Sequence, residues 1–427
     1  MTSEDEKTAS CTETGSWAVL LCLCGIFLHI VLSDPLLNAM GFHYSGEQGR
    51  FYEKMHPGTY FILLSFLILA GNNFNPIETV LLLCLRQPAC MALLFIDTLA
   101  LAYMALRSDA SGLAFMIDTH ISAVICAIVL ARMPEPLCQK MVTCLIIAAL
   151  ANGIIGIAEA LGKFRIFLFD PDWTVLHEEY FRASAFIGHP LDNAMFTAIV
   201  LFITLASDYP QIIKACTGTI LMAALLAFGG RAALFYSIFG LISLTAASLW
   251  RMLVHQRVTL PQLAMVIAAG LAAPLFLTVL LWLSAHGGVG ERLTASMAKW
   301  DNSADARRLA FTVFHYMTEE EIWFGISPSR IVDIVYRMNL KVPLSDLENP
   351  WIMMCISLGM LTFPFWLLAM FAFIYHLMKH KPLALQLAIM AYFLIASTAN
   401  SFGRKDANFL IMVSAITCAG QLRIKRL

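Results

Sequence analysis

Three arginines lie in short polar segments between long apolar runs, and their type and position suit them for chemistry. Arg182 precedes the segment Phe186-Ile187-Gly188-His189-Pro190, Arg231 ends the triplet Gly229-Gly230-Arg231, and Arg404 follows Gly403. A guanidinium group stays charged at neutral pH and binds phosphate oxygens through two parallel N–H bonds. Three such groups gathered at one end of an apolar bundle indicate a site for an anionic lipid headgroup.

The composition predicts the class of protein that must position these arginines. The chain has 427 residues, of which 59% are hydrophobic and 13% are charged, and its mean hydropathy is +0.74. These values are typical of a polytopic integral membrane protein. The formal net charge of −1 provides no basic field, so no nucleic acid partner is expected. Eleven cysteines, mostly scattered in apolar runs, predict no disulfide framework, and neither a metal nor a cofactor is expected.

Long apolar runs predict an all-α fold of about twelve transmembrane helices, because roughly 17 to 25 apolar residues cross a bilayer. The run 59–85 contains the polar break Asn72-Asn73-Phe74-Asn75-Pro76, so it is either one broken helix or a helix followed by a re-entrant piece. The expected spans are 17–32, 59–85, 88–106, 112–131, 141–161, 186–206, 211–228, 232–249, 260–283, 351–378, 383–400 and 407–422.

The expected spans form a membrane domain, and one large outer loop separates the ninth span from the tenth. With the N-terminus inside, the short inner segments hold most of the Lys and Arg residues, so the positive-inside bias predicts that both termini are cytoplasmic. The expected parts are a cytoplasmic tail at 1–16, transmembrane helices one to nine at 17–284, a large periplasmic loop at 285–350, transmembrane helices ten to twelve at 351–422 and a cytoplasmic tail at 423–427.

The outer loop 285–350 is predicted to carry two amphipathic helices. Apolar residues recur at helical spacing between Ala306 and Met317 and again between Ile331 and Met338. Ser327-Pro328 is a typical start for the second helix, with serine as the cap and proline at the first helical position. Both helices are expected at the mouth of the bundle.

Acids and amides near the outer ends of the spans are expected to line or support an outward-facing cavity. A charge in the middle of a bilayer costs about 2.5 to 3.5 kcal/mol, so such residues usually face a cavity or a partner. The residues expected at the cavity are Asp118, His120, Glu159, Asp192, Asn193 and Asn349. Asp97 and Glu78 lie deeper and are interpreted as members of structural pairs with Asn or Arg.

Four segments resemble, in order, motifs of one family of membrane enzymes. The segments are Arg182-Ala-Ser-Ala-Phe-Ile-Gly-His189-Pro190-Leu-Asp192-Asn193-Ala, then Gly229-Gly230-Arg231-Ala-Ala, then Asp305-Ala-Arg307-Arg308-Leu with Phe324-Gly325-Ile326, and then Leu347-Glu348-Asn349-Pro-Trp351 with Leu358-Gly359-Met360-Leu361. They are similar to motifs of the O-antigen ligase and polymerase (Wzy-like) family. The segment Tyr52-Glu-Lys-Met-His56-Pro57-Gly58-Thr59 further resembles its VpsF-like exopolysaccharide branch.

The resemblance implies transfer of a glycan from an undecaprenyl diphosphate donor to a sugar hydroxyl at the periplasmic face of a bacterial inner membrane. The arginines would bind the diphosphate and stabilise it as leaving group, and no metal would be needed. Further partners would be the lipid bilayer and proteins of polysaccharide export and chain-length control. The residues that it assigns to diphosphate binding are Arg182, Arg231 and Arg307 or Arg308, and Arg404 is expected to join them because it falls on the same side of the membrane.

The general base and the exact reaction stay open at this point. Glu348 stands where ligases of the family carry a loop histidine, and Cys355-Ile356-Ser357 replaces a later acid, which weakens the ligase alternative more than the polymerase. Glu348 is the first candidate base and His189 the second. A lipid-linked oligosaccharide flippase or secondary transporter is the main rival, since broken helices and buried acids would serve it too. A scaffolding membrane subunit is a further alternative.

Overall fold

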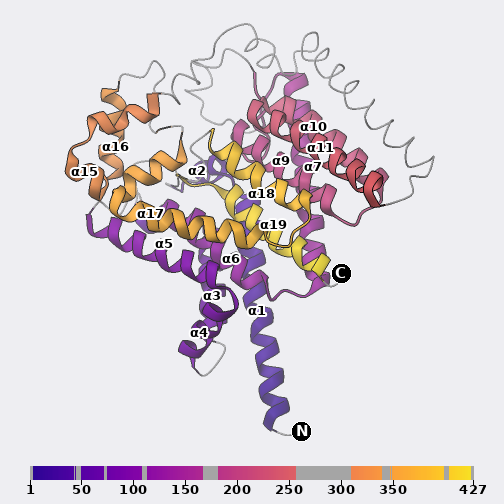
Figure 1. The fold of residues 1–427 in the computed structure, drawn as a ribbon, viewed down its shortest axis with the longest axis horizontal. Coiled ribbons are helices and arrows are strands. Elements are labelled where there is room, and N and C mark those ends of the chain that lie inside the picture. The colour runs from indigo at the N-terminus through magenta and orange to yellow at the C-terminus, as the bar shows by residue number, and fades with distance from the viewer. Residues whose placement is uncertain are drawn as a thin grey trace. The chain divides into compact units, whose positions relative to one another are not determined.

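The computed structural model describes residues 3–42, 44, 50–71, 75–107, 113–166, 181–255, 309–338, 347, 349–398 and 403–424. Every regular element in these ranges is a helix (Figure 1). The chain forms two compact units. Unit 1 comprises Met1–Cys144, Asn302–Lys381 and Ala396–Leu427, and unit 2 comprises Leu145–Asp301 and Pro382–Ile395.

Unit 1 is built from helices of both ends of the chain. Its elements are α1 (Ser3–Val31), α2 (Asp34–Ala39), η1 (Phe51–Lys54), α3 (Pro57–Gly71), α4 (Pro76–Arg86), α5 (Pro88–Arg107), the π-helical turn η3 (Met116–Ile121), α6 (Ser122–Leu130), η4 (Phe311–Tyr316), α15 (Glu319–Phe324), α16 (Pro328–Arg337), α17 (Pro350–Met378) and α19 (Ala407–Ile424). Helix α7 (Glu135–Gly162) begins in unit 1 and continues into unit 2, which also holds α9 (Pro190–Ala206), α10 (Gln211–Phe228), α11 (Arg231–His255) and α18 (Leu383–Ala396).

Several of these helices have the length and apolar composition of membrane spans. In the described part of the chain, five meet both conditions: α5, α7, α10, α17 and the segment Arg231–Arg251 of α11. Shorter apolar helices lie at Ser16–Val31, Met116–Leu130, Pro190–Ala206, Leu383–Ala396 and Ala407–Leu422. The protein is therefore all-helical and compatible with a place in a membrane, while twelve crossings and their direction stay predictions.

Each expected span that the structure describes overlaps a helix, although 186–206 becomes helical only at Pro190. The expected span 211–228 matches α10 in both bounds, and 351–378 differs from α17 by one residue at its start. The run 59–85 forms two helices, α3 and α4, because Asn75 caps α4 and Pro76 follows it at the first helical position. The span 260–283 lies outside the described residues.

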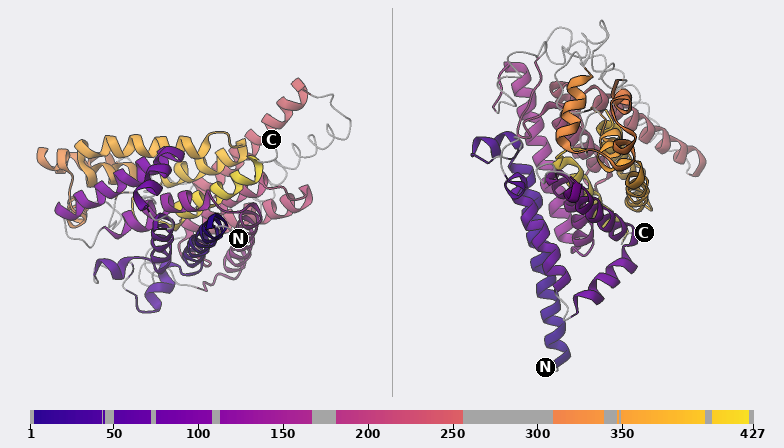
Figure 2. Two further views of the ribbon diagram at one scale, coloured as in Figure 1. Left: turned by 90° about the horizontal axis from the view of Figure 1, so that it is seen from below. Right: turned by 90° about the vertical axis from the view of Figure 1, so that its left-hand side faces the viewer.

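Helices α1 and α3 of unit 1 lie side by side and approach very closely at two glycines (Figure 1; Figure 2). A Cβ atom at Gly25 would lie 2.6 Å from the carbonyl oxygen of Gly58 and 2.6 Å from the side chain of Ile62. Only glycine allows the two backbones to come this near, as in other membrane helix pairs. This crossing places the C-terminal end of α1 beside His56 and Thr59.

The second expected loop helix is confirmed as α16, whereas in the range expected for the first, from Ala306 to Met317, the structure describes the short 3₁₀ helix η4. Ser327 caps α16, because its hydroxyl accepts a hydrogen bond from the Arg330 N–H at 3.3 Å, and Pro328 stands at the first helical position. Buried residues of α16 pack with those of η4 and the start of α17. This cluster comprises Ala310, Val313, Ile331, Ile334, Val335, Leu347, Ile352, Met353 and Ile356.

Helix α17 is interrupted inside its length. Gly359 has φ +73° and ψ +161°, values outside the helical region, and the chain bends there. Gly325, at the C-terminal end of α15, also has positive φ (+81°) and faces Gly359. A Cβ on either glycine would overlap backbone atoms near the other, so both positions require glycine. Two of the sequence motifs that carry the family resemblance therefore contact each other.

Candidate functional site

Arg182 and the Gly229-Gly230-Arg231 turn meet in unit 2. The stem of the Arg182 side chain lies against Gly229, where an added Cβ would be 3.2 Å from Cγ and 3.3 Å from Cδ of the arginine. Gly229 ends α10 in the left-handed conformation, with φ +66°, and Arg231 begins α11 two residues later. We call Arg182, Gly229 and Arg231, with the neighbouring cations Lys163 and Arg165, the arginine site.

The segment before α9 is held against α10 through its backbone and a buried carboxylate. The Ala183 N–H donates to the Ala227 carbonyl at 3.1 Å. Glu159, on α7, is fully buried, and one of its oxygens accepts the N–H groups of Ser184 at 2.8 Å and Ala185 at 2.9 Å. Its other oxygen accepts the Ile166 N–H at 2.8 Å. Glu159 thus fixes the backbone on both sides of 167–180, and in the structure it supports the arginine site.

A pair of buried amides fixes the start of α9. Asn152 of α7 donates from its amide to the Asn193 side-chain oxygen at 2.7 Å, and its own side-chain oxygen accepts the Phe186 N–H at 3.0 Å. Asn193 in turn donates to the carbonyl of His189 at 2.9 Å. Asn193, which was expected at a cavity, is buried, and its amide is hydrogen-bonded within the fold.

The N-terminal ends of two long helices adjoin the arginine site. Gly230 packs so closely on Ala194 that a Cβ there would overlap the alanine methyl group. The start of α11 therefore lies beside the N-terminal part of α9. Unpaired N–H groups and the helix dipole make such ends favourable for anions. This attraction for anions adds to the attraction that the positively charged guanidinium groups provide.

Two cations of the arginine site were missed by the sequence prediction. Arg165 donates to the Arg182 carbonyl at 3.1 Å from Nε and 3.0 Å from a terminal nitrogen, and its guanidinium lies 4.8 Å from the centroid of the Phe181 ring. The Lys163 ammonium lies 5.5 Å from the same ring. Their position in the same expected inter-helix segment as Arg182 was the signal available in the sequence.

His189, the second candidate base, lies at the cap of α9. Its Nδ1 is 3.4 Å from Oδ2 of Asp192, and both side chains are partly exposed, at 17% and 24%. A carboxylate beside an imidazole orients the ring, and an oriented imidazole can accept a proton from a nearby hydroxyl. The structure thus pairs two residues predicted at the site.

Of the remaining predicted residues, two belong to unit 1 and three lie outside the described part of the chain. Arg404 belongs to unit 1, where its side chain is exposed and its carbonyl accepts the Thr119 hydroxyl at 3.0 Å. Asn349 caps α17, accepting the N–H groups of Trp351 and Ile352 at 3.0 and 3.1 Å. Glu348, Arg307 and Arg308 lie outside the described residues.

Unit 1 holds a second buried polar cluster, centred on Asp118. Its carboxylate accepts the Thr59 hydroxyl at 2.7 Å and the Tyr44 hydroxyl at 3.2 Å. The His56 N–H also donates to it, at 3.1 Å. The His29 ring stacks on the His56 ring with centroids 3.8 Å apart. These residues, together with Lys405, form what we call the Asp118 cluster.

Lys405 supplies the cation of the Asp118 cluster. Its ammonium donates to the carbonyls of Tyr44 and Lys54 and lies 3.7 Å from the centroid of the Tyr44 ring. Burial lowers the pKa of Lys405 to about 8, although Asp118 acts in the opposite direction. Burial likewise lowers the pKa of His56 to about 4, so this ring is neutral. The sequence prediction had singled out Arg404, which is exposed, whereas its half-buried neighbour Lys405 belongs to the cluster.

Two deep titratable residues have aromatic partners. Asp97 was expected to pair with Asn or Arg, and its carboxylate instead accepts the Trp366 indole N–H at 3.0 Å. His120 was expected at a cavity, and it is fully buried, 5.7 Å from the Trp366 ring and 5.9 Å from the Phe409 ring between centroids. Both belong to the packed interior of unit 1.

No model of a known protein family matches this chain, and no curated protein matches it at a significant level. Its chemistry is therefore inferred from its own residues.

Proposed function

We propose that this protein is a membrane glycosyltransferase that polymerises polysaccharide repeat units carried on undecaprenyl diphosphate at the periplasmic face of a bacterial inner membrane. The observation that carries the proposal is the contact of Arg182 with the Gly229 turn that leads into Arg231. Guanidinium groups beside two helix N-termini form a binding site suited to a diphosphate. The apolar helices around them suit a polyprenyl chain.

In this reaction the bond between the anomeric carbon and the diphosphate oxygen breaks as a bond to the acceptor hydroxyl oxygen forms. The hydroxyl proton passes to a base, and the lipid diphosphate leaves with its added negative charge. Arg182 and Arg231 stabilise that charge, which is larger in the transition state than in the bound donor. His189, oriented by Asp192, is the described candidate for the base, and Glu348 is the other.

The test is chain growth by the purified protein supplied with an undecaprenyl diphosphate oligosaccharide. Removal of one preorganised donor to a developing charge typically costs about 10²- to 10³-fold in rate. We expect that loss for Arg231→Ala and at least as much for Arg182→Ala, with partial recovery in Arg231→Lys. Arg251→Ala is the matched control, because Arg251 is exposed near the other end of α11. Unchanged product ladders in both alanine variants would reject these roles.

Two alternatives give different outcomes in the same assay. A ligase would transfer the glycan once, to a lipid A core or a protein, and would give no ladder. A lipid-linked oligosaccharide flippase or secondary transporter would move the donor across the bilayer without forming a glycosidic bond. The Asp118 cluster is the observation in favour of this second alternative, because buried ionisable residues in apolar helices often serve transport.

A further inference from the structure

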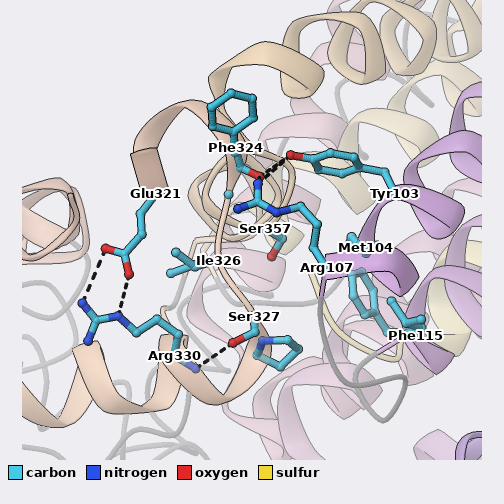
Figure 3. Close-up of a pocket in the computed structure, with 13 residues that line it drawn as sticks. Tyr103, Met104, Arg107, Phe115, Glu321, Phe324, Ile326, Ser327, Arg330 and Ser357 are labelled. Carbon is cyan, nitrogen blue, oxygen red and sulfur yellow. Dashed lines mark hydrogen bonds and ion pairs between the residues drawn. The ribbon is translucent and has the colours of Figure 1, made fainter. Parts of the chain in front are cut away.

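Unit 1 contains a pocket where the C-terminal end of α5 meets the outer-loop helices. Figure 3 shows Tyr103 and Arg107 of α5 on one side, Glu321 and Arg330 of the loop helices on the other, and Ser357 of α17 between them in the view. The pocket has a cavity volume of about 200 Å³. Clefts for drug-sized ligands are roughly 300–1,000 Å³, so this smaller space suits a ligand of about one sugar ring.

The wall of this pocket is fixed by the interruption of α17. Gly325 and Gly359 face each other there, and the Ile326 N–H donates to the Ile356 carbonyl at 2.8 Å. Ser357 lies between Ile356 and the bend and lines the pocket. Irregular backbone in a membrane helix is tolerated where it lines a cavity or is covered by protein. The two glycine motifs thus build one side of a preformed pocket.

The charged groups of the pocket are held in fixed positions. Nε of Arg330 donates to Glu321 Oε1 at 2.8 Å, and the Thr318 N–H donates to Glu321 Oε2 at 2.8 Å. The hydrogen bond from Arg330 lowers the pKa of Glu321, so its carboxylate is ionised. Arg330 also pairs with Asp333. The carboxylate of Glu321 is therefore a positioned acceptor at the edge of the pocket.

The opposite edge combines a guanidinium group with two aromatic rings. Arg107 donates to the carbonyl of Phe324, and its guanidinium carbon lies 5.7 Å from the Tyr103 centroid and 5.4 Å from the Phe324 centroid. The Tyr103 hydroxyl donates to the same carbonyl. The Phe324 side chain is 43% exposed, so part of it remains open to a ligand.

We propose that this pocket binds a pyranose residue of the glycan, a specificity site that rests on the proposed function. Hydroxyl groups of a sugar both donate and accept, so they match a fixed carboxylate and a guanidinium group together. The negative faces of aromatic rings attract the C–H side of a sugar. A diphosphate suits the pocket less well, because it would meet the ionised Glu321.

The test is saturation-transfer NMR of the full chain in detergent with the methyl glycosides of glucose, galactose, mannose and glucuronic acid. Loss of an aromatic contact weakens binding by roughly 3- to 10-fold. We expect this loss for Phe324→Leu and near-normal binding for Phe324→Tyr, which keeps the ring. Phe311→Leu is the matched control, since Phe311 is an exposed loop phenylalanine at 63% that does not line the pocket.

Three results would overturn the assignment. They are no transfer to any glycoside in the wild type, equal transfer in Phe324→Leu and wild type, and displacement of the glycoside by inorganic diphosphate. A chain that polymerises donor but binds no glycoside here would keep the proposed function and lose this site. A chain that binds glycosides here without forming glycosidic bonds would keep the site and lose the polymerase reaction.

Discussion

Arg182 and Arg231 differ in burial although both belong to the arginine site. Arg182 is 8% exposed, whereas Arg231 is half-buried at the start of α11. A buried guanidinium group loses hydration and must be compensated by neighbouring acceptors or anions. Replacement of Arg182 is therefore expected to affect the folding of unit 2 as well as any ligand. Arg231 is the better residue for testing diphosphate binding alone.

Lys405 gives a prediction about pH at the residue scale. Its ordinary pKa of 10.5 is lowered to about 8 by burial, while Asp118 partly opposes the shift. A lowered lysine pKa means that the folded state binds the proton less tightly than the unfolded state. The contribution of Lys405 to stability is therefore greatest above pH 10.5 and declines as the pH falls toward 8.

The measurement is the rate at which Lys405 reacts with an amine reagent, followed by mass spectrometry across pH. We expect a midpoint near pH 8 in the wild type. In Asp118→Asn the midpoint should move lower, because the carboxylate that favours the ammonium form is absent. A midpoint that does not move would show that Asp118 does not act on Lys405.

The crossing of α1 and α3 gives a prediction at the scale of elements. Gly25→Ala places a methyl group against the Gly58 carbonyl, which is backbone and cannot rotate away. Overpacking of this kind costs about 1–3 kcal/mol. Thermal unfolding in detergent should show a lower Tm for Gly25→Ala than for the wild type.

Gly71→Ala is the control for this substitution. Gly71 ends α3, and a Cβ there would have no neighbour within 4 Å. Its Tm should stay at or slightly above that of the wild type, because alanine is the better helix former. Equal Tm values for the two variants would mean that the close crossing does not stabilise unit 1.

At the scale of the whole molecule, contacts within unit 1 agree with the alternation of the expected spans. Arg107 and Phe324, both expected outside, are hydrogen-bonded to each other. Gln421 donates to the Leu130 carbonyl at 2.7 Å, and both are expected inside. These contacts thus join segments that are expected on the same side of the membrane. Which side is cytoplasmic stays a prediction.

Labelling of single cysteines tests that direction. In a background without native cysteines, Ser329→Cys in the outer loop should react with a membrane-impermeant maleimide in intact spheroplasts. Lys379→Cys, after α17, should react only once the membrane is permeabilised, because it is expected inside. Both side chains are exposed in the structure. The reverse pattern would invert the topology and place the arginine site in the cytoplasm.

The sequence by itself determined the helical class and the positions of most helices. The bounds of α10 and the Ser327-Pro328 start of α16 were predictable, because apolar runs and helix caps depend on residues that are close in the chain. The sequence also indicated Arg182 and Arg231, since a charge beside an apolar run stands out locally.

Only the tertiary structure decided which distant residues meet. Arg165 beside Arg182, Trp366 on Asp97, Lys405 in the Asp118 cluster and Gly325 against Gly359 all depend on how whole helices pack. A local pattern shows that a helix has an apolar face but not which partner covers it. For this reason the arginines were predictable one by one, whereas the pocket at the bend of α17 was not.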